Sequence, residues 1–394
     1  MTQASPRLEL GALGLERGGI LLLKRALQAL APGERLEVCG ASPELPVHLR
    51  AWARAQGQGF TEQDGRLWLT RADHGRWRGA ERAGGVAAAG VVESPQARWG
   101  LAARGALVES GAPTFHFVLS EKSEVWAEEA GRLYAQAAAA QWDPATAIPW
   151  DAEITHPDEV EDAVVQVMTY LIENETAALL VPARFLGQLH PHFREVMQLL
   201  AITAADEARH IEVFTRRASL RRETLGLSTH GGQASLKTLL EEPDFALASF
   251  LLSVLGEGSF LSLLWFLQEH APDVITRQVC RLAAQDEARH VAFGLAHLSR
   301  HVALDPGLRG RLAQAIQSRN QALAQTAGLN EEVFDALVIL AAGGFEPEQI
   351  ALGHDRVLTL HHDMDHGRRV RLERLGFSEE EAAALSALHT RNFM

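Results

Sequence analysis

The amino-acid sequence predicts a mainly α-helical protein, a four-helix bundle with extra helices that follows a small N-terminal α/β sandwich. The pentapeptide Asp-Glu-Ala-Arg-His occurs twice, 80 residues apart, in stretches with helical periodicity. Residues 244–267 form an almost wholly apolar run that fits a buried helix. Residues 6–72 instead alternate short strand and helix patterns, which predict the sandwich. The length of 394 residues permits two or three such domains.

The elements of the first domain are predicted in the order βαβαββ. They are a strand at residues 8–10, a helix at 19–30, a strand at 35–39, a helix at 46–56 and a hairpin at 59–70. This order, over residues 1–72, resembles a TusA-type sulfur-carrier domain.

The chemistry of that carrier family is missing from this segment. The family's Cys-Pro-x-Pro motif places a thiol at a helix N-terminus, but residues 17–20 here read Arg-Gly-Gly-Ile. We therefore expect no persulfide on this domain. Cys39, in the second strand, is predicted to be a small buried hydrophobe. The resemblance then implies a docking or dimerisation module instead of a sulfur carrier.

The rest of the chain divides at a change of composition. Residues 73–100 are rich in Gly, Ala and Arg, which predicts a linker. Residues 101–394 are predicted to form the helical domain, with the bundle at about 157–300 and further helices at 301–394. Apart from the two halves of the bundle, the sequence contains no internal repeat.

Each pentapeptide carries a Glu-x-x-His pattern. Because residues three apart share a helix face, Glu207 with His210, and Glu287 with His290, can hold the same cation. Roughly one such pattern is expected by chance in a chain of this length, and a solvated salt-bridge face commonly explains it. Two identical copies favour a metal site, provided that each has a further Glu upstream.

Glu257 is the upstream candidate for the second motif. It is the only acid in residues 245–267 and lies 30 residues before Glu287. A lone charge in such a run is costly unless it is paired or bound to a metal. The run is long enough to span a bilayer, but a central Glu without flanking basic clusters favours a buried bundle helix. Gly256 and Gly258 beside it fit a π-type bulge, room for a substrate or close helix packing.

Glu175 is the upstream candidate for the first motif and lies 32 residues before Glu207. The helix that carries it is predicted to begin near Pro157, with acids in its first turn. Glu175 is in register with the apolar stripe of this helix, which is formed by Met168, Leu171, Ile172 and Leu179. Glu173 is out of that register, so we expect it to face solvent or to support the site from behind.

With these residues in place, residues 157–300 resemble the ferritin-like di-iron carboxylate superfamily. The resemblance implies two half-sites, one of Glu175, Glu207 and His210 and the other of Glu257, Glu287 and His290. It implies two iron ions, with a manganese–iron pair as the alternative, and O2 as co-substrate. Glu207 and Glu287 would bridge the ions and act as the catalytic ligands whose coordination shifts as oxygen binds.

The remaining polar residues of the pentapeptides have a supporting role in this interpretation. Asp206 and Asp286 are expected to accept the second ring proton of a ligating His, and Arg209 and Arg289 to hold those acids. Such contacts fix the tautomer and the orientation of the imidazole.

Several members of the superfamily are excluded by what the chain lacks. The radical Tyr of ribonucleotide reductase follows the first His by four residues, and Phe214 stands there in this chain. Rubrerythrins need four cysteines for a further iron site, whereas this chain has only Cys39 and Cys280. Ferritins are short, and this chain has long segments before and after the bundle, which disfavours iron storage. Electrons must then come from a separate reductase or from the substrate itself.

The function predicted is a non-haem di-iron oxygenase or oxidase that hydroxylates, desaturates or N-oxygenates a small organic substrate. A manganese–iron oxidase, an iron-handling protein without an organic substrate, and a bundle that has lost its metal are the alternatives. The substrate, the reductant and the oligomer, for which a homodimer is one option, are not determined by the sequence.

Three other segments carry weaker predictions. Residues 220–242 are expected to form a mobile loop over the site. Residues 141–151 predict a Trp-anchored turn that packs on the bundle. His362 and His366 have the helical i, i+4 spacing of a metal-binding pair, although a polar helix face explains them more simply.

Composition limits the partners of the protein. A net charge of −13 without a basic cluster speaks against nucleic acid and against anionic membranes. The N-terminus has no apolar signal segment, and two cysteines in unrelated segments fit a reducing compartment. We therefore expect a cytoplasmic protein.

Overall fold

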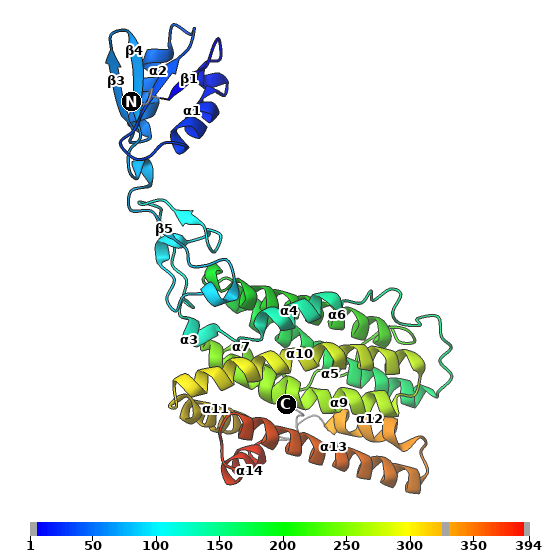
Figure 1. Ribbon diagram of the computed structural model, residues 1–394. Helices are drawn as coiled ribbons and strands as arrows, with labels where there is room; N and C mark the ends of the chain where they lie inside the picture. Colours follow the sequence, from blue (N-terminus) through cyan, green and yellow to red (C-terminus); the bar gives the residue numbers. More distant parts are fainter. Residues whose placement is uncertain (1–5, 325–330, 390–394) are drawn as a thin grey trace. The chain divides into compact units, whose positions relative to one another are not determined.

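The computed structural model describes residues 6–324 and 331–389 and is mainly helical, as predicted (Figure 1). The chain forms two compact units. The first comprises Met1–Gly90 with Gln96–Phe115, and the second comprises Val91–Pro95 with His116–Met394. The larger second unit contains all of the long helices.

The first unit begins with the predicted α/β domain. Its elements are β1 (Arg7–Glu9), α1 (Gly19–Gln28), β2 (Arg35–Cys39), α2 (Leu45–Ala55), β3 (Gly59–Gln63) and β4 (Arg66–Thr70). The sheet has the order β1-β2-β4-β3, in which β1 and β2 are parallel and the other pairs are antiparallel. Leu23, Leu49 and Leu69 are fully buried between the helices and the sheet. The element order is the one predicted, and the bounds differ by one or two residues.

The N-terminus of α1 carries glycine residues where a sulfur-carrier domain would have a cysteine. Gly18 precedes α1 with a φ of 106°, a left-handed conformation that glycine adopts at little cost. Cys39 is only partly buried, so the prediction of a buried hydrophobe was wrong. The reason is its place as the last residue of β2, whose burial decreases at the end of the strand. The resemblance to a sulfur-carrier domain stays a prediction.

The predicted linker contains short hydrogen-bonded elements. They are η2 (Gly75–Trp77), β5 (Glu81–Arg82), η3 (Ala88–Gly90) and η4 (Ala97–Trp99), and β6 (Leu107–Val108) follows just beyond the predicted linker. β5 and β6 form an antiparallel pair, and Arg76 makes an ion pair of 2.7 Å with Glu109. Part of this segment is therefore folded on itself, while Val91–Pro95 packs with the second unit.

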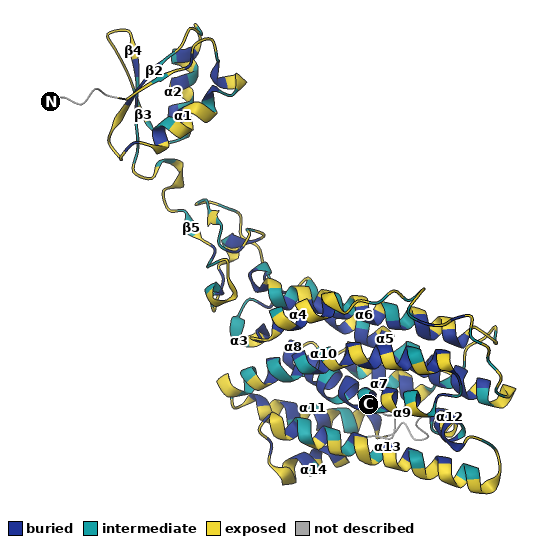
Figure 2. Ribbon diagram, turned by 45° about the vertical axis from the view of Figure 1, so that its right-hand side comes forward, coloured by how far each residue is buried: buried dark blue, intermediate teal, exposed yellow. Residues whose placement is uncertain are grey.

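The second unit opens with the long helices of the bundle and the short helices that precede or connect them. They are α3 (Lys122–Val125), α4 (Ala130–Ala139), α5 (Asp158–Leu186), η5 (Pro191–Phe193), α6 (Arg194–Ala218), α7 (His230–Leu240), α8 (Phe245–Ser249), η6 (Phe250–Glu257), α9 (Gly258–His270) and α10 (Val274–Leu304). α5 packs along α6, and α9 packs along α10, so the bundle consists of two helix pairs (Figures 1 and 2).

Four further helices cover the α9 side of the bundle. They are α11 (Leu308–Leu323), α12 (Glu331–Ala342), α13 (Pro347–Arg374) and α14 (Glu379–Ala387). α12 packs against α5 and α13, and α13 packs against α9 (Figure 1). Figure 2 shows that buried residues line the facing sides of these helices while exposed residues follow their outer sides.

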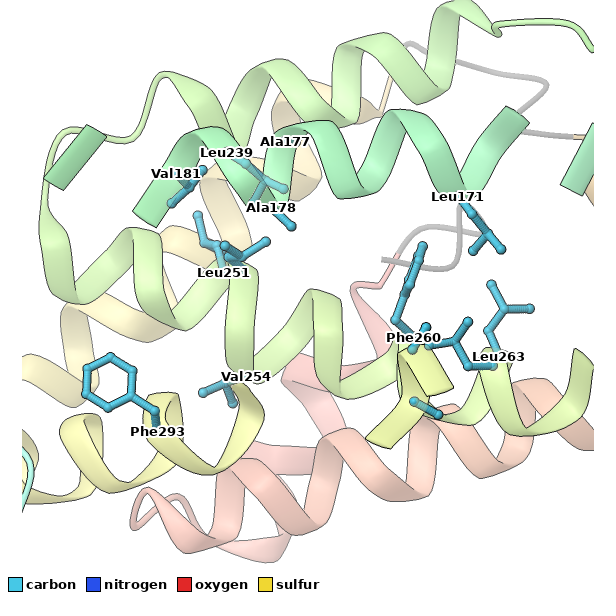
Figure 3. Close-up of a cluster of buried hydrophobic side chains, with 14 of the residues drawn as sticks. Leu171, Ala177, Ala178, Val181, Leu239, Leu251, Val254, Phe260, Leu263 and Phe293 are labelled. Carbon is cyan, nitrogen blue, oxygen red and sulfur yellow. The ribbon is translucent and has the colours of Figure 1, made fainter. Parts of the chain in front are cut away.

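The interior of the bundle is an apolar core in which the long helices meet. Figure 3 shows Leu171 of α5, Val254 of η6, Leu263 of α9 and Phe293 of α10, all nearly inaccessible to solvent. In the predicted stripe of α5, Met168 and Leu171 are buried, whereas Ile172 and Leu179 are half-buried. The buried face of α5 is broader than this stripe, because α6, α7 and α12 all pack against the helix.

The most apolar stretch, Phe245–His270, has the length and composition of a membrane span, and 72% of its most apolar window is buried inside the protein. It runs through α8, η6 and α9 and packs against α10. Its apolar character is therefore explained by burial in the bundle, as the lone Glu257 had indicated.

The predicted loop over residues 220–242 was wrong for its second half, which is helix α7. The side chain of Thr229 accepts a hydrogen bond from the backbone N–H of Gly232, which caps the helix N-terminus. Leu236 and Leu239 are buried as α7 packs on α5 and α11. The Thr cap and these two leucines were the signals of the helix.

A buried ion-pair network holds one end of the bundle together. Arg217 of α6 has no exposed side-chain surface and donates two hydrogen bonds to Glu161 of α5, at 2.8 and 3.0 Å. It also contacts Asp273 at 2.8 Å and Thr276 at 2.7 Å, at the start of α10. Burial alone would raise the pKa of Glu161 and Asp273, but the guanidinium lowers both. One cation thereby ties three helices.

The substitution Arg217→Met should lower the free energy of unfolding by about 3–5 kcal/mol, because it leaves two buried acids without their cation. Chemical denaturation followed by far-UV circular dichroism measures this loss. The matched control is Arg221→Met, which removes an exposed pair with Asp158 and should change stability by about 1 kcal/mol or less. Equal stability of the two variants would contradict the role given to Arg217.

Candidate metal centre

The structure brings all six predicted ligand residues together in the core of the bundle. Glu175 comes from α5, Glu207 and His210 from α6, Glu257 from the end of η6, and Glu287 and His290 from α10. None of the six is more than 5% exposed. Local helix geometry places each Glu-x-x-His pair on one face, and the packing of the helices turns those faces toward one another.

The six residues form two groups of four that share two members. One group is Glu175, Glu207, His210 and Glu287, and the other is Glu207, Glu257, Glu287 and His290. Within each group the ligand atoms lie within 4.8 Å of one another. Glu207 and Glu287 belong to both groups, so these two carboxylates would be shared by the two ions.

The imidazoles face the shared carboxylates through Nδ1. His210 Nδ1 lies 3.3 Å from Glu207 and 3.4 Å from Glu287. His290 Nδ1 lies 2.9 Å from Glu207 and 3.3 Å from Glu287. Each bridging carboxylate therefore stands between the two imidazoles, with Glu175 3.4 Å from His210 Nδ1 on one side.

Each of the two supporting aspartates contacts the His of the other motif. His210 Nε2 lies 3.2 Å from Asp286, and His290 Nε2 lies 3.4 Å from Asp206. A carboxylate at Nε2 keeps the ring proton on that atom, which leaves the Nδ1 lone pair for a metal. The sequence indicated this role for Asp206 and Asp286 but not that each would serve the His of the other helix.

Arg209 links the two aspartates. Its guanidinium donates to Asp206 at 2.5 Å and to Asp286 at 2.8 Å, so one cation of α6 supports both halves of the site. Of the two aspartates, Arg289 contacts Asp286, and it also donates to the carbonyl oxygen of Gln285 at 3.0 Å. Both arginines therefore hold the acids as predicted, but their roles are unequal.

Two residues of the predicted Trp-anchored turn at residues 141–151 also contact the aspartates. The sequence analysis did not predict these contacts. Gln141 donates to Asp206 at 2.8 Å, and Trp142 Nε1 donates to Asp286 at 2.8 Å. The Trp142 ring also stacks near His210, with 6.5 Å between ring centroids and 14° between planes. The predicted Trp-anchored turn thus reaches the metal centre itself. The only sequence signal was the position of this segment before the first long helix.

The electrostatics of the cluster favour cations. Burial raises the pKa of Glu175 and Glu257 well above the usual range, and the neighbouring carboxylates raise it further. Burial alone would lower the pKa of His210 and His290, but the carboxylates around them raise it well above normal. Protons therefore compensate the buried negative charge when no metal does. Metal binding would displace them, so metal affinity should rise with pH.

The donor set fits a pair of hard or borderline metal ions. Four carboxylates and two imidazoles suit iron or manganese better than a structural zinc, which prefers thiolates. Both oxygens of Glu207 and one oxygen of Glu175 are shielded from solvent and lack a hydrogen bond of good geometry to any residue that the structure describes. Buried acceptors of this kind need a cation, because their desolvation is otherwise uncompensated.

Glu257 is presented by a π-helical segment. The π turn spans Phe250–Glu257, which confirms that the ligand lies at a π-type bulge. Arg371 of α13 donates to the carbonyl oxygen of Val254 at 2.6 Å. A Cβ at Gly258 would lie 2.4 Å from Nε of Arg371. Gly258 therefore also permits the close approach of α13.

An apolar cavity of about 30 Å³ ends at Glu257 and His290. Its walls include Val181, Phe185, Leu252 and Phe293. This volume accommodates one or two water-sized molecules. O2 would therefore fit beside the cluster, whereas a larger organic molecule requires side chains to move.

The other predicted positions lie outside the ligand groups. Phe214 is fully buried, and its ring centroid is 6.3 Å from that of His210, so an apolar ring occupies the place where the resemblance would put a radical tyrosine. Glu173 is half-buried and belongs to neither ligand group. His362 and His366 are exposed on α13, as a polar helix face would have them.

The chain matches no protein-family model, and no curated protein matches it. Solved structures do match it. One is a variant of an R2-like ligand-binding oxidase with an aerobically reconstituted Mn/Fe cofactor, with 19% identity and a TM-score of 0.52 over 64% of this chain and 95% of its own. Another is a variant of such an oxidase with a reconstituted Fe/Fe cofactor, with 19% identity and a TM-score of 0.51 over the same shares. This likeness shows that the chain has the ferritin-like helical fold, which confirms the predicted fold class.

The substitution Glu207→Ala should abolish dinuclear metal binding, because Glu207 belongs to both ligand groups. Plasma mass spectrometry of the loaded and desalted protein measures the metal content per chain. The control is Glu212→Ala, which removes an exposed acid of the same helix and should leave the content unchanged. An E207A protein that retains two ions per chain would rule out the bridging role.

The substitution Asp286→Asn should weaken metal binding by about 10 to 100-fold, because the amide cannot hold the Nε2 proton of His210 as a carboxylate does. Competition with a chelator measures the affinity. Asp363→Asn removes an exposed acid of α13 and serves as control. An affinity in D286N equal to that in the control would show that Asp286 does not position the imidazole.

Proposed function

We propose that this protein is a two-metal oxidase or oxygenase that activates O2 at a carboxylate-bridged pair of iron ions, or of one manganese and one iron ion. One observation carries the proposal: two four-residue ligand groups share Glu207 and Glu287. A structural metal would need one closed group of ligands. Two groups with shared carboxylates instead support a pair of ions that change oxidation state together.

The chain's own residues would hold and insulate this pair. Glu175, Glu207 and His210 would bind one ion, and Glu257, Glu287 and His290 the other, with the shared carboxylates joining them. When bound, the two ions supply redox chemistry with O2. Asp206 and Asp286 hold the imidazole protons at Nε2. The apolar cavity keeps bulk water from the open side of the cluster.

The substrate of the proposed reaction is a small organic molecule that is hydroxylated, desaturated or N-oxygenated. The apolar walls of the cavity beside Glu257 support an apolar reacting part. Electrons come from a separate donor or from the substrate, because the chain has only two cysteines for any further redox site. In this proposal the protein is cytoplasmic, and its small N-terminal domain is a docking or dimerisation module.

An iron-handling protein without an organic substrate is the second candidate. The small volume of the cavity beside Glu257 favours it, because an organic substrate does not fit there unless side chains move. The two functions differ in the amount of iron that each chain oxidises.

Anaerobic loading with ferrous iron followed by exposure to O2 tests the proposal. An O2-activating enzyme should consume O2 in proportion to the two ions that its ligand groups hold, and then stop. An oxygen electrode with increasing ferrous iron measures this limit. Oxidation that continues through many ions per chain would favour iron handling, and no O2 consumption by loaded protein would overturn the proposal.

A further inference from the structure

A second hollow is lined in part by η6, the segment that ends in Glu257. Seven aliphatic residues of η6, α11, α13 and α14 and of the segment after α14 line it: Leu251, Leu255, Ile316, Leu323, Leu372, Leu385 and Leu388. Its polar lining consists of Arg319, Asn320, Arg368, Ser386 and His389. Neither set includes a residue of the cavity beside Glu257, so the two hollows are separate.

The charge of this hollow is not balanced. Among the described residues, Arg319 and Arg368 line it and no acid does. The nearest acid that pairs with either arginine is Asp365, 4.0 Å from Arg368 and 2.7 Å from Arg369. Asp365 also accepts a hydrogen bond from Ser386 at 2.6 Å. Arg368 shares Asp365 with Arg369, and Arg319 forms an ion pair with no acid of the described residues. The charge of Arg319 therefore lies in apolar surroundings without an acidic partner, a costly arrangement without an anion.

Two donors of the hollow lack partners in the described part of the chain. Nη1 of Arg319 and Nε2 of His389 are shielded from solvent and make no hydrogen bond there. The other end of the Arg319 guanidinium is held by Ser235, to which Nη2 donates at 2.7 Å. Burial lowers the pKa of Arg319 to about 10, so the guanidinium remains charged at neutral pH. The pKa of His389 is well below normal because of burial and of the arginines around it, so a neutral imidazole faces the hollow.

A surface groove provides a way in. It has a volume of about 430 Å³ and is lined by residues of α7, α8, η6 and α11 and by the segment after α7. Leu251 and Arg319 line both the groove and the hollow, so Arg319 stands where the two meet. Glu241, Glu242 and Arg311 also line the groove, so an entering ligand passes charges of both signs before it reaches Arg319 and the aliphatic walls.

We propose that this hollow is a binding site for a small organic monoanion, a carboxylate with a short apolar body. The carboxylate receives hydrogen bonds from Arg319 and His389, and the apolar body lies among the leucines. The hollow has a volume of about 30 Å³, the same as the cavity beside Glu257, so the leucine side chains must move apart to admit the apolar body. A carboxylate gives Arg319 the acidic partner that the described residues do not provide. Aliphatic walls favour an organic anion over an inorganic one, because an inorganic ion leaves them without contacts.

The hollow and the metal centre share one element, η6, but no lining residue. Leu251 and Leu255 line the hollow from η6, the segment that ends in Glu257. Figure 3 shows Leu251 and Val254 on the same stretch of ribbon. An occupant of the hollow therefore packs against the element that carries a metal ligand, but it contacts no ligand itself.

Calorimetric titration of the metal-loaded, full-length protein tests this site. Isovalerate is the probe, with its neutral amide isovaleramide and inorganic phosphate as comparisons. Isovalerate should bind, and Arg319→Gln should weaken its binding at least about tenfold, because a charge-assisted hydrogen bond is lost. Arg311→Gln, which removes a charge from the outer groove only, should leave the binding unchanged.

Each other outcome decides against the proposal. Isovalerate that binds R319Q as tightly as the unaltered protein occupies another place, such as the metal ions. Phosphate binding without isovalerate binding shows a site for inorganic anions, and equal binding of isovaleramide shows that charge is not recognised. Should R319Q fail to fold, Leu388→Phe fills the hollow with its charges intact, and undiminished isovalerate binding to that variant overturns the proposal.

Discussion

The concentration of four carboxylates in one buried volume is the constraint on which the rest of the structure depends. Glu175, Glu207, Glu257 and Glu287 are at most 5% exposed, and unpaired buried charge opposes folding strongly. Raised pKa values of Glu175 and Glu257 show that protons compensate part of this charge. Two divalent cations would compensate all of it. Because each helix of the bundle supplies a ligand, the same requirement fixes how the four helices lie together.

The residues that hydrogen-bond to the ligating histidines link the two halves of the cluster. Asp286 contacts the His of α6, Asp206 contacts the His of α10, and Arg209 contacts both aspartates. A shift of α6 against α10 would therefore disturb both imidazoles at once. Because each aspartate orients the imidazole of the other helix, the geometry of the site depends on how α6 and α10 pack together. This dependence suits two ions that must act together.

The π-helical segment separates two hollows of different character. One ends at Glu257 and has mostly apolar walls, and the other is lined by two arginines and by no acid among the described residues. Arg371 stabilises the segment by donating to a carbonyl oxygen of the π turn. Glu257 at the end of this segment belongs to a ligand group, while Leu251 and Leu255 line the second hollow, so one short element serves two sites.

The sequence by itself determined the fold class, the order of elements in the first domain and the six residues that meet in the core. These features rest on local patterns: helical periodicity, i, i+3 spacing and a lone acid in an apolar run. Only the tertiary structure decided that Asp206 and Asp286 exchange partners, that Gln141 and Trp142 reach the site, and that α7 replaces an expected loop. It alone brought Arg319 and Arg368 to one hollow. Such contacts join residues far apart in the chain, and helix packing, which has no local signature, decides which of them meet.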